Sequence, residues 1–337
     1  MGVPDLLAAE LAAPFERANV EDAASIALRH WGLATERAHR VDTERDDTFE
    51  LGTDAGNYAL KLSHPGDDPA VIDLQTAAIE WAAVHDSSLS IARPLSSLDG
   101  TLQPVVPVAG TGRIARIFPW MPGQSLRAEL SNAAPTPQLL HAIGATQGRL
   151  SVALAGFRHP AESRVLAWDV AQLASLAGLI EAVERPGPVA AALEQHISDV
   201  APRIADLPQQ VIHNDGNLDN LLVDLVDQPR ITVLDFGDVV RTARVLDLAV
   251  ATSYLLPADD SYRASDTLAS MTDGWASVLA LAPEEQELLP RLVIARLLQR
   301  ILLGSWLARE RPSNADYLGR NIAHTRAQLA IALTEGW

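Results

Sequence analysis

The chain has 337 residues, of which 48% are hydrophobic and 20% are charged, as in ordinary globular proteins. It contains no cysteine, which excludes disulfides, thiolate nucleophiles and cysteine-ligated zinc. Its net charge of −17 argues against a nucleic-acid binder and mildly favours a cationic or zwitterionic ligand, although a soluble acidic surface is the simpler explanation. No apolar run is long enough to span a membrane, and acidic residues interrupt the N-terminal stretch, so a cytoplasmic protein is expected.

The first third of the chain is predicted to form a small lobe rich in strands. Apolar residues recur at three- and four-residue spacing over residues 5–32, which predicts helix. Short apolar runs over 38–62 predict two or three antiparallel strands with a hairpin turn at 54–57. A helix is expected over 70–85, and SIARPL, TLQPVVPV and RIARIF look like further strands. This lobe is predicted to comprise residues 1–118.

The remaining residues, 119–337, are predicted to form a larger and mostly helical lobe. The break PWMPGQ, rich in proline and glycine, separates the two parts. A loop and two strands are predicted within 211–237. Helices are predicted over 134–155, 164–184, 188–206, 240–256, 262–281, 283–309 and 315–334. The fold class is therefore α+β, with a small antiparallel-sheet N-terminal lobe and a larger helical C-terminal lobe.

One polar loop, VIHNDGNLDNLL at 211–222, contains His213, Asp215 and Asn220, and a predicted hairpin leads from it to the triplet DFG at Asp235. The hairpin is expected to return Asp235 to the neighbourhood of Asp215 and Asn220. Two carboxylates and an amide supply the hard oxygen ligands that Mg²⁺ bound to a nucleotide requires. One carboxylate must stay off the metal to accept a proton from an attacking hydroxyl. Ordinary turn residues would explain either motif alone, but not both at hairpin spacing.

The spacings H-x-D-x-x-x-x-N and D-F-G reproduce the catalytic loop and metal triplet of kinases. With Asn214 after the histidine and GN after Asp215, the loop resembles the aminoglycoside phosphotransferase/choline kinase superfamily more than the protein kinases. That resemblance implies a bilobal protein-kinase-like fold, and ATP and Mg²⁺ as cofactors. It implies that Asp215 is the catalytic base and that His213 orders the loop. Asn220 and Asp235 would hold Mg²⁺.

The nucleotide side is expected in the N-terminal lobe. Lys61, at the end of the predicted strand NYALKL, is interpreted as the ligand of the α/β-phosphates, the alternative being a solvated edge residue. The loop from Thr43 to Asp47 is expected to cover the phosphates with backbone N–H groups and short polar side chains. Gln75 stands where protein kinases place the glutamate that pairs with this lysine. Asp73 and Glu80 are near, so the partner of Lys61 stays open.

The hinge and the acceptor pocket are less sharply defined. Backbone groups around Phe118 and Trp120 are expected to recognise adenine, although an ordinary turn between lobes is the alternative. Asp238 follows the metal triplet and is a candidate receptor for an amine, and Trp168 is a candidate lining residue. Arg296 is either a buried structural cation, which is favoured, or a receptor for a substrate carboxylate.

Over nearly its whole length the sequence is similar to the hydroxylysine kinase branch of this superfamily, and also to type II homoserine kinases. The segments that carry the similarity include HWGL, VDTERDDTF, NYALKL, DLQTAAIEW, RIFPWMPG and VIHNDGNLDNLLV, with Thr48 where asparagine is usual. The resemblance implies transfer of the ATP γ-phosphoryl group to the hydroxyl of a small amine-bearing acceptor. A hydroxy-amino acid or amino alcohol is the first choice, and an aminoglycoside is the second.

Two other classes of function are less compatible with the sequence. A catalytically silent kinase-like binding module is disfavoured because every chemical group that the reaction needs is present. A protein kinase is disfavoured because no activation segment follows Asp235. The partner expected is a small hydroxylated molecule, with neither nucleic acid nor membrane. The sequence does not determine the acceptor, the preference between ATP and GTP, or the oligomeric state.

Overall fold

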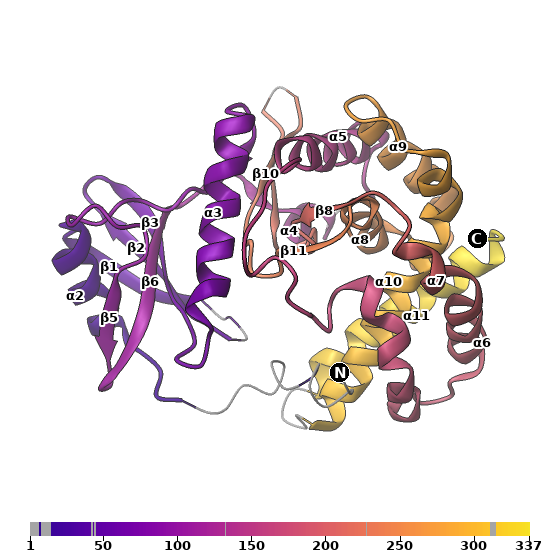
Figure 1. Ribbon diagram of the computed structural model, residues 1–337, viewed down its shortest axis with the longest axis horizontal. Coiled ribbons are helices and arrows are strands. Elements are labelled where there is room, and N and C mark those ends of the chain that lie inside the picture. Colours follow the sequence, from indigo (N-terminus) through magenta and orange to yellow (C-terminus); the bar gives the residue numbers. More distant parts are fainter. Residues whose placement is uncertain are drawn as a thin grey trace.

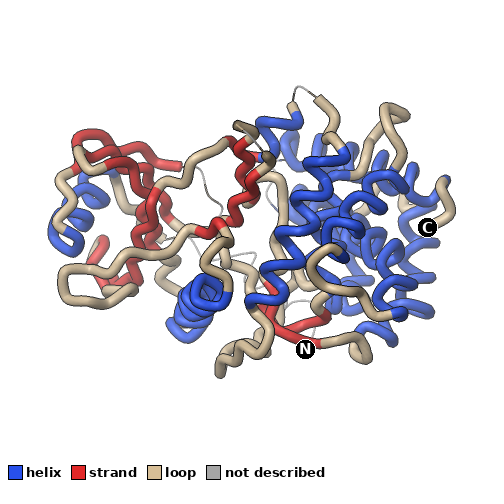
Figure 2. The backbone as a smooth tube through the Cα atoms, turned by 90° about the horizontal axis from the view of Figure 1, so that it is seen from above, coloured by secondary structure: helices blue, strands red, loops and turns tan. Residues whose placement is uncertain are grey.

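The computed structural model shows two lobes joined through a central helix, α3 (Figure 1). We use N-lobe for α2 with the five-stranded sheet, and C-lobe for β4 and the elements from β7 onward. The helices gather on the C-lobe side when the molecule is turned by 90° as well (Figure 2). The predicted bilobal α+β fold is therefore confirmed, whereas a boundary after residue 118 stays a prediction. The structure describes residue 7 and residues 15–41, 43, 45–131, 133–226, 228–310 and 315–337.

The N-lobe sheet is antiparallel, in the order β1-β2-β3-β6-β5. The turn predicted at 54–57 joins β2 to β3, where Thr53 pairs with Gly56. Lys61 on β3 lies opposite Arg116 on β6, and residues directly opposite in an antiparallel pair share one face. Two cations therefore stand side by side under this sheet. The strands are β1 (Thr35–Val41), β2 (Asp47–Thr53), β3 (Gly56–Leu62), β5 (Val105–Val108) and β6 (Thr111–Pro119).

Helix α2 (Val20–Trp31) covers the N-lobe sheet. Asn19 and Asp22 form a reciprocal capping box at its start, and Gly32 ends it in the left-handed conformation with φ 69°. Its buried residues belong to the same core cluster as Phe49 and Leu60 of the sheet. The helix predicted over 5–32 therefore begins at Val20 in the described part, and most of its earlier residues lie outside the described residues.

Helix α3 (Pro69–His85) matches the helix predicted over 70–85. Asp68 caps it by accepting the backbone N–H of Ala70, and Pro69 supplies a first residue that needs no hydrogen-bond acceptor. Although α3 precedes β5 and β6 in the chain, its buried residues join the C-lobe core cluster rather than that of the N-lobe. The helix therefore fixes the position of the N-lobe sheet above the C-lobe.

Short strands in the C-lobe carry the motif loops. The hairpin β9–β10 pairs Leu221 with Val233, and β11 pairs antiparallel with β8. Helix was predicted over 240–256, but residues 240–243 form β11 because Val240, Thr242 and Ala243 are buried against β8, and the helix begins at Val245. The strands are β4 (Ser90–Ile91), β7 (Gln124–Ser125), β8 (Gln209–Ile212), β9 (Leu221–Asp224), β10 (Arg230–Val233) and β11 (Val240–Ala243).

The segment predicted as an α-helix over 164–184 is a 3₁₀-helix, η1 (Val170–Ala182). Its buried residues recur at every third position, at Val170, Leu173, Leu176 and Leu179, which suits the three residues per turn of a 3₁₀-helix. The predicted helix over 188–206 consists of α6, a π-helical turn η2 and α7.

The other helices of the C-lobe enclose its core, and all of them except the short α4 were predicted from the sequence. Helices α5 and α9 approach very closely, since a Cβ atom at Gly144 would lie 2.1 Å from the Met271 carbonyl oxygen. No described helix is long and apolar enough to cross a bilayer. The bounds are α4 (Leu126–Leu130), α5 (Pro137–Ala153), α6 (Gly187–Gln195), η2 (His196–Val200), α7 (Ala201–Ile204), α8 (Val245–Leu255), α9 (Ala264–Ala276), α10 (Pro283–Glu310) and α11 (Ala315–Thr334).

Candidate active site

The polar loop between β8 and β9 is anchored by one buried carboxylate. Asp247 of α8 accepts the backbone N–H of His213 at 3.1 Å and that of Asn214 at 2.6 Å. Burial raises the pKa of Asp247, although His213 and these hydrogen bonds oppose the rise. Asn214 takes a positive φ of 65°, which costs energy for a residue other than glycine. The loop is therefore held in a strained conformation by a group from a later helix.

His213 links this loop to the DFG triplet. Its Nε2 donates to the carbonyl oxygen of Leu234 at 2.8 Å, and its Nδ1 accepts the backbone N–H of Asp215 at 3.3 Å. The ring also packs edge-to-face on Phe236. Both ring nitrogens are thus engaged with the protein, and the histidine fixes the distance between the two motifs.

Two amides hold the carboxylate of Asp215. Asn217 Nδ2 donates to Oδ1 at 2.9 Å, and Asn220 Nδ2 donates to Oδ2 at 2.5 Å. The backbone N–H of Leu234 donates to the Asn220 carbonyl at 2.8 Å, which brings the start of the triplet beside the loop, as the predicted hairpin requires. Asn217 was not among the sequence candidates, because its role depends on the side chain turning back by two residues.

Asp235 joins the two lobes. Its Oδ2 accepts from Lys61 Nζ at 2.8 Å, and its Oδ1 accepts the backbone N–H of Gly237 at 3.1 Å. Like Asn214 it has a positive φ, of 52°. The sequence left the acid partner of Lys61 open, and the structure gives Asp235. Neither alternative acid takes that place, since Glu80 pairs with Arg93 and Asp73 with His159.

The pKa values of Asp215 and Asp235 are shifted in opposite directions. Burial raises the pKa of Asp215 to about 6, with Arg296 opposing the rise. Removal from water between the lobes tends to raise the pKa of Asp235 as well. The charge and hydrogen bond of Lys61 outweigh this effect and lower the pKa to about 2. A carboxylate with a pKa near 6 accepts a proton more readily than an ordinary aspartate does. One with a pKa near 2 stays ionised and suits a metal ligand.

The donors at this site fit Mg²⁺ associated with a nucleotide. Asn220 uses its amide nitrogen toward Asp215, so its side-chain oxygen is left for a cation, and Asp235 supplies a carboxylate. No group of three or more His, Cys, Asp or Glu side chains in the described chain is placed to hold a metal, so an ion here would rely on Asp235, Asn220 and the nucleotide. Mg²⁺ commonly takes one or two protein oxygens and completes its shell with phosphates and water.

Comparison with known proteins agrees with this geometry. A family model described as the phosphotransferase enzyme family matches residues 35–281. The chain belongs to this family. Among curated relatives, the hydroxylysine kinase of Danio rerio is 25% identical over 311 residues, which cover 87% of this chain and 85% of that relative. The predicted superfamily is therefore confirmed, and the relatives found are hydroxylysine kinases, as the predicted branch requires.

Solved structures with the same fold include an amicoumacin kinase in complex with AMP-PNP, Ca²⁺ and Ami. It has a TM-score of 0.70 and 17% identity, covering 92% of this chain and 93% of that one. A microcompartment-associated aminopropanol kinase has a TM-score of 0.64 and 21% identity, covering 93% and 96%. The protein is thus an ATP-dependent phosphotransferase whose acceptor is an alcohol group of a small molecule.

Asp47, the last residue of the loop predicted to cover the phosphates, has its side chain directed into the N-lobe. In this phosphotransferase Asp47 is fully buried at the start of β2, and its carboxylate binds Arg17, Arg40 and Arg113. These guanidinium groups leave no role for it toward an anion. Thr43 lies in the preceding loop, where its hydroxyl donates to the Asp46 carbonyl at 2.6 Å, and residues 42 and 44 lie outside the described residues.

Gln75 contacts a different cation from the one expected. Its Oε1 accepts from Arg116 at 2.8 Å, and its Nε2 donates to the Gly237 carbonyl at 3.4 Å. The amide therefore bridges β6 of the N-lobe to the metal triplet, while Lys61 pairs with Asp235. Arg116 was not a sequence candidate, because only the register of β3 against β6 places it beside Lys61.

Pairing within the N-lobe sheet limits which groups of the predicted hinge are free to contact adenine. Phe118 is 7% exposed and belongs to the C-lobe core cluster, which suits an apolar wall. The backbone N–H of Trp120, however, donates to the Asn57 carbonyl at 2.9 Å and is not free to bind a base. The indole of Trp120 is 44% exposed, so any contact with adenine would come from its side chain or from neighbouring backbone groups.

The three residues predicted for the acceptor all lie near Asp215. Arg296 donates to the Trp168 carbonyl at 2.6 Å, and its guanidinium is 3.9 Å from Asp215 Oδ1. Burial, together with the charge of Asp215, raises the pKa of Asp238 to about 7. The structure thus brings acidic and basic groups to the same side of the candidate base.

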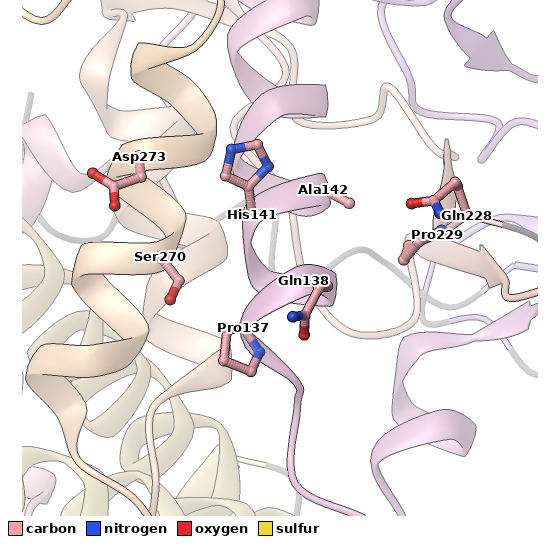
Figure 3. A pocket seen from close by; sticks show the side chains of 8 residues that line it. All are labelled: Pro137, Gln138, His141, Ala142, Gln228, Pro229, Ser270 and Asp273. Carbon is pink, nitrogen blue, oxygen red and sulfur yellow. The ribbon is translucent and has the colours of Figure 1, made fainter.

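A separate surface hollow of about 440 Å³ lies between α5, α9 and the turn after β9 (Figure 3). His141, Asp273 and Gln228 are among its lining residues. It includes none of the motif residues, so we assign it no part in the reaction.

Proposed function

We propose that this phosphotransferase transfers the γ-phosphoryl group of ATP to the hydroxyl of a small amine-bearing acceptor, a hydroxy-amino acid or an amino alcohol. The observation that carries the proposal is the convergence of Asp215, Asn220 and Asp235, with Lys61 reaching Asp235 from the other lobe. The similarity to hydroxylysine kinases supports this class of acceptor.

Asp215 is the base in this proposal. Its carboxylate accepts the proton of the acceptor hydroxyl as the hydroxyl oxygen forms a bond to the γ-phosphorus, while the bond from that phosphorus to the bridging oxygen of ADP breaks. Asn217 and Asn220 orient the carboxylate through their amide groups. His213 keeps the loop at a fixed distance from the triplet.

The remaining groups serve the nucleotide. Asn220 and Asp235 would hold Mg²⁺, which neutralises phosphate charge when bound. Lys61 would bind the α- and β-phosphates from β3, with Arg116 beside it on the same face. Thr43 lies in the loop proposed to cover the phosphates, and Phe118 is proposed to pack against adenine.

The test is replacement of the proposed base. Asp215→Asn should lower kcat by about 10³-fold or more, because general-base catalysis typically contributes about 10²–10⁴-fold. Stabilisation by Mg-ATP in a thermal melt should persist, since the variant keeps Asn220, Asp235 and Lys61. Asp219→Asn is the matched control, because Asp219 lies in the same loop but pairs with Arg127 at the surface.

Two outcomes would contradict the proposal. If Asp215→Asn keeps wild-type turnover, Asp215 is not the base. If the wild-type chain gains no stability from Mg-ATP and releases no ADP with any acceptor, a kinase-like binding protein without catalysis becomes the better explanation.

A further inference from the structure

Two arginines on successive turns of α10 surround one tyrosine beside the proposed base. Arg296 and Arg300 are four residues apart and so share a face of the helix. Their guanidinium carbons lie 5.8 Å and 4.1 Å from the centre of the Tyr254 ring. We call Arg296 and Arg300 the arginine pair. The inference drawn from this pair and Tyr254 rests on the function proposed above.

Arg296 is 1% exposed, yet its hydrogen-bond partners are neutral. It donates to the Trp168 carbonyl at 2.6 Å, to Gln299 Oε1 at 2.8 Å and to the Tyr254 hydroxyl at 3.4 Å. Its Nε is buried without an acceptor. Within the described chain the one carboxylate inside 4 Å is that of Asp215, at 3.9 Å and so beyond hydrogen-bond length.

Arg300 is half-buried and also lacks an acid. Its guanidinium donates to the Ser253 carbonyl at 3.1 Å and to Gln328 Oε1 at 3.2 Å. No described carboxylate lies within ion-pair distance of it. Burial lowers its pKa to about 10, and the charges of Arg296 and Arg127 act in the same direction. Two neighbouring cations without a compensating anion are costly to bury, and a bound anion would remove that cost.

A second carboxylate near the proposed base, that of Asp238, has no partner among the described residues. Asp238 accepts no hydrogen bond and forms no ion pair with any residue that the structure describes. Arg164 and Arg296 are near enough to attract it, whereas Asp215 repels it. Within the described chain, the surroundings of Asp215 therefore contain Arg296, which has no acid at hydrogen-bond length, and Asp238, which has no partner.

We propose that the acceptor is a zwitterion whose carboxylate binds at Arg300, with Arg296 behind it, while its ammonium faces Asp238 and its hydroxyl reaches Asp215. Arg300 supplies the direct contact because it is the accessible member of the arginine pair, and the buried Arg296 contributes positive potential. An amino alcohol or an aminoglycoside lacks the anion that this arrangement calls for. The chemistry thus selects a hydroxy-amino acid within the proposed class.

Acceptors that differ by a single carboxylate test this. The pairs are homoserine with 3-aminopropan-1-ol, serine with ethanolamine, threonine with 1-aminopropan-2-ol, and 5-hydroxylysine with 1,5-diaminopentan-2-ol; kanamycin represents the aminoglycosides. ADP release is measured with Mg-ATP. In the pair with the best acceptor, we expect kcat/KM for the amino acid to exceed that for the amine by 100-fold or more. Equal or faster phosphorylation of the amine, or of kanamycin, would overturn the inference.

Variants locate the carboxylate subsite. Arg300→Met should reduce the ratio between amino acid and amine to less than fivefold, chiefly through KM for the amino acid, and Arg300→Lys should restore part of it. Arg203→Met is the matched control, because Arg203 forms an exposed ion pair with Glu287 at the start of α10, and should leave the ratio unchanged. A folded Arg300→Met that keeps the wild-type ratio would disprove the assignment.

The two proposals fail in different ways. If the zwitterion inference alone is wrong, an amino alcohol or kanamycin is phosphorylated best and the chain is still a kinase with Asp215 as base. If the proposed function is wrong, no acceptor of any class releases ADP, and the inference falls with it.

Discussion

The N-lobe and the C-lobe each bury a cluster of arginines, and the clusters differ in what neutralises them. In the N-lobe, Arg113 donates to Asp47 and to the carbonyl oxygens of Leu62 and Ser63 at 2.6–2.7 Å. Burial tends to raise the pKa of Asp47, but Arg113 and Arg40 outweigh it and hold the pKa low. In the C-lobe, the arginine pair has neutral partners and, among the described residues, no acid at hydrogen-bond length.

This difference distinguishes buried arginines that stabilise the fold from buried arginines that are available to bind an anionic ligand. A buried ion pair whose groups are all satisfied holds strands together and has nothing left to bind. A buried cation without an anion weakens the empty protein and gains most from an anionic ligand. The same criterion applies inside the N-lobe, because Arg116 is 5% exposed and contacts Gln75 and Thr76 rather than an acid.

The largest loss of stability is expected at Arg113, in the cluster where the buried charges are paired. Arg113→Met would leave the Asp47 carboxylate buried with only the two partly exposed arginines, Arg17 and Arg40. Breaking a buried ion pair from one side typically costs about 3–5 kcal/mol. Urea unfolding should therefore show a loss of that size, whereas Arg300→Met should lose much less stability and should instead raise KM for the amino-acid acceptor. Equal losses of stability in the two variants would remove the distinction between the clusters.

His196 extends the comparison to a buried titratable group that has neither a charged nor a neutral hydrogen-bond partner among the described residues. It is 3% exposed, both ring nitrogens lack hydrogen bonds, and burial lowers its pKa from 6.5 to about 4. The unfolded chain therefore binds a proton in a pH range where the folded chain does not, so stability is full above pH 6.5 and falls as the pH drops toward 4.

Between pH 7 and pH 5 this histidine should cost about 2 kcal/mol of unfolding free energy. His196→Phe should remove that part of the pH dependence in urea titrations, and the exposed His39 replaced by phenylalanine serves as the control. An unchanged pH slope in His196→Phe would mean that the ring is protonated or hydrogen-bonded in the folded protein.

The smallest effect is expected at Arg116, where the ligand would bring most of the compensating charge. Arg116→Met should raise KM for ATP by about tenfold, equivalent to about 1.4 kcal/mol, since a hydrogen bond to a charged group contributes about 1.5–3 kcal/mol. kcat should change less than KM. Steady-state kinetics at saturating acceptor measure both, and a variant whose KM for ATP is unchanged would place Arg116 with the structural arginines.

Local motifs predicted the centre of the site well. The turn at 54–57 and the hairpin between Asn220 and Asp235 are encoded by residues close in sequence, so their geometry follows from turn chemistry and strand length. The sequence predicted that Lys61 pairs with an acid, but it did not identify which acid. A contact that joins residues 174 positions apart depends on how the lobes dock.

The failures have the same origin. Asp47 looks like a loop acid in sequence, and only the packing of three arginines from other segments shows that it is buried. Residues 240–243 were included in a predicted helix, but pairing with β8 makes them a strand. Backbone groups around Phe118 and Trp120 were predicted to recognise adenine, and the N–H of Trp120 is taken by Asn57 across the sheet.

The sequence by itself determined the order of the lobes, the catalytic loop and the chemistry of phosphoryl transfer, because these depend on residue type and on spacing within a few tens of residues. Only the tertiary structure decided which buried charges are satisfied. Compensation of a charge depends on distance in space, and the groups that supply or withhold it come from strands and helices far apart along the chain.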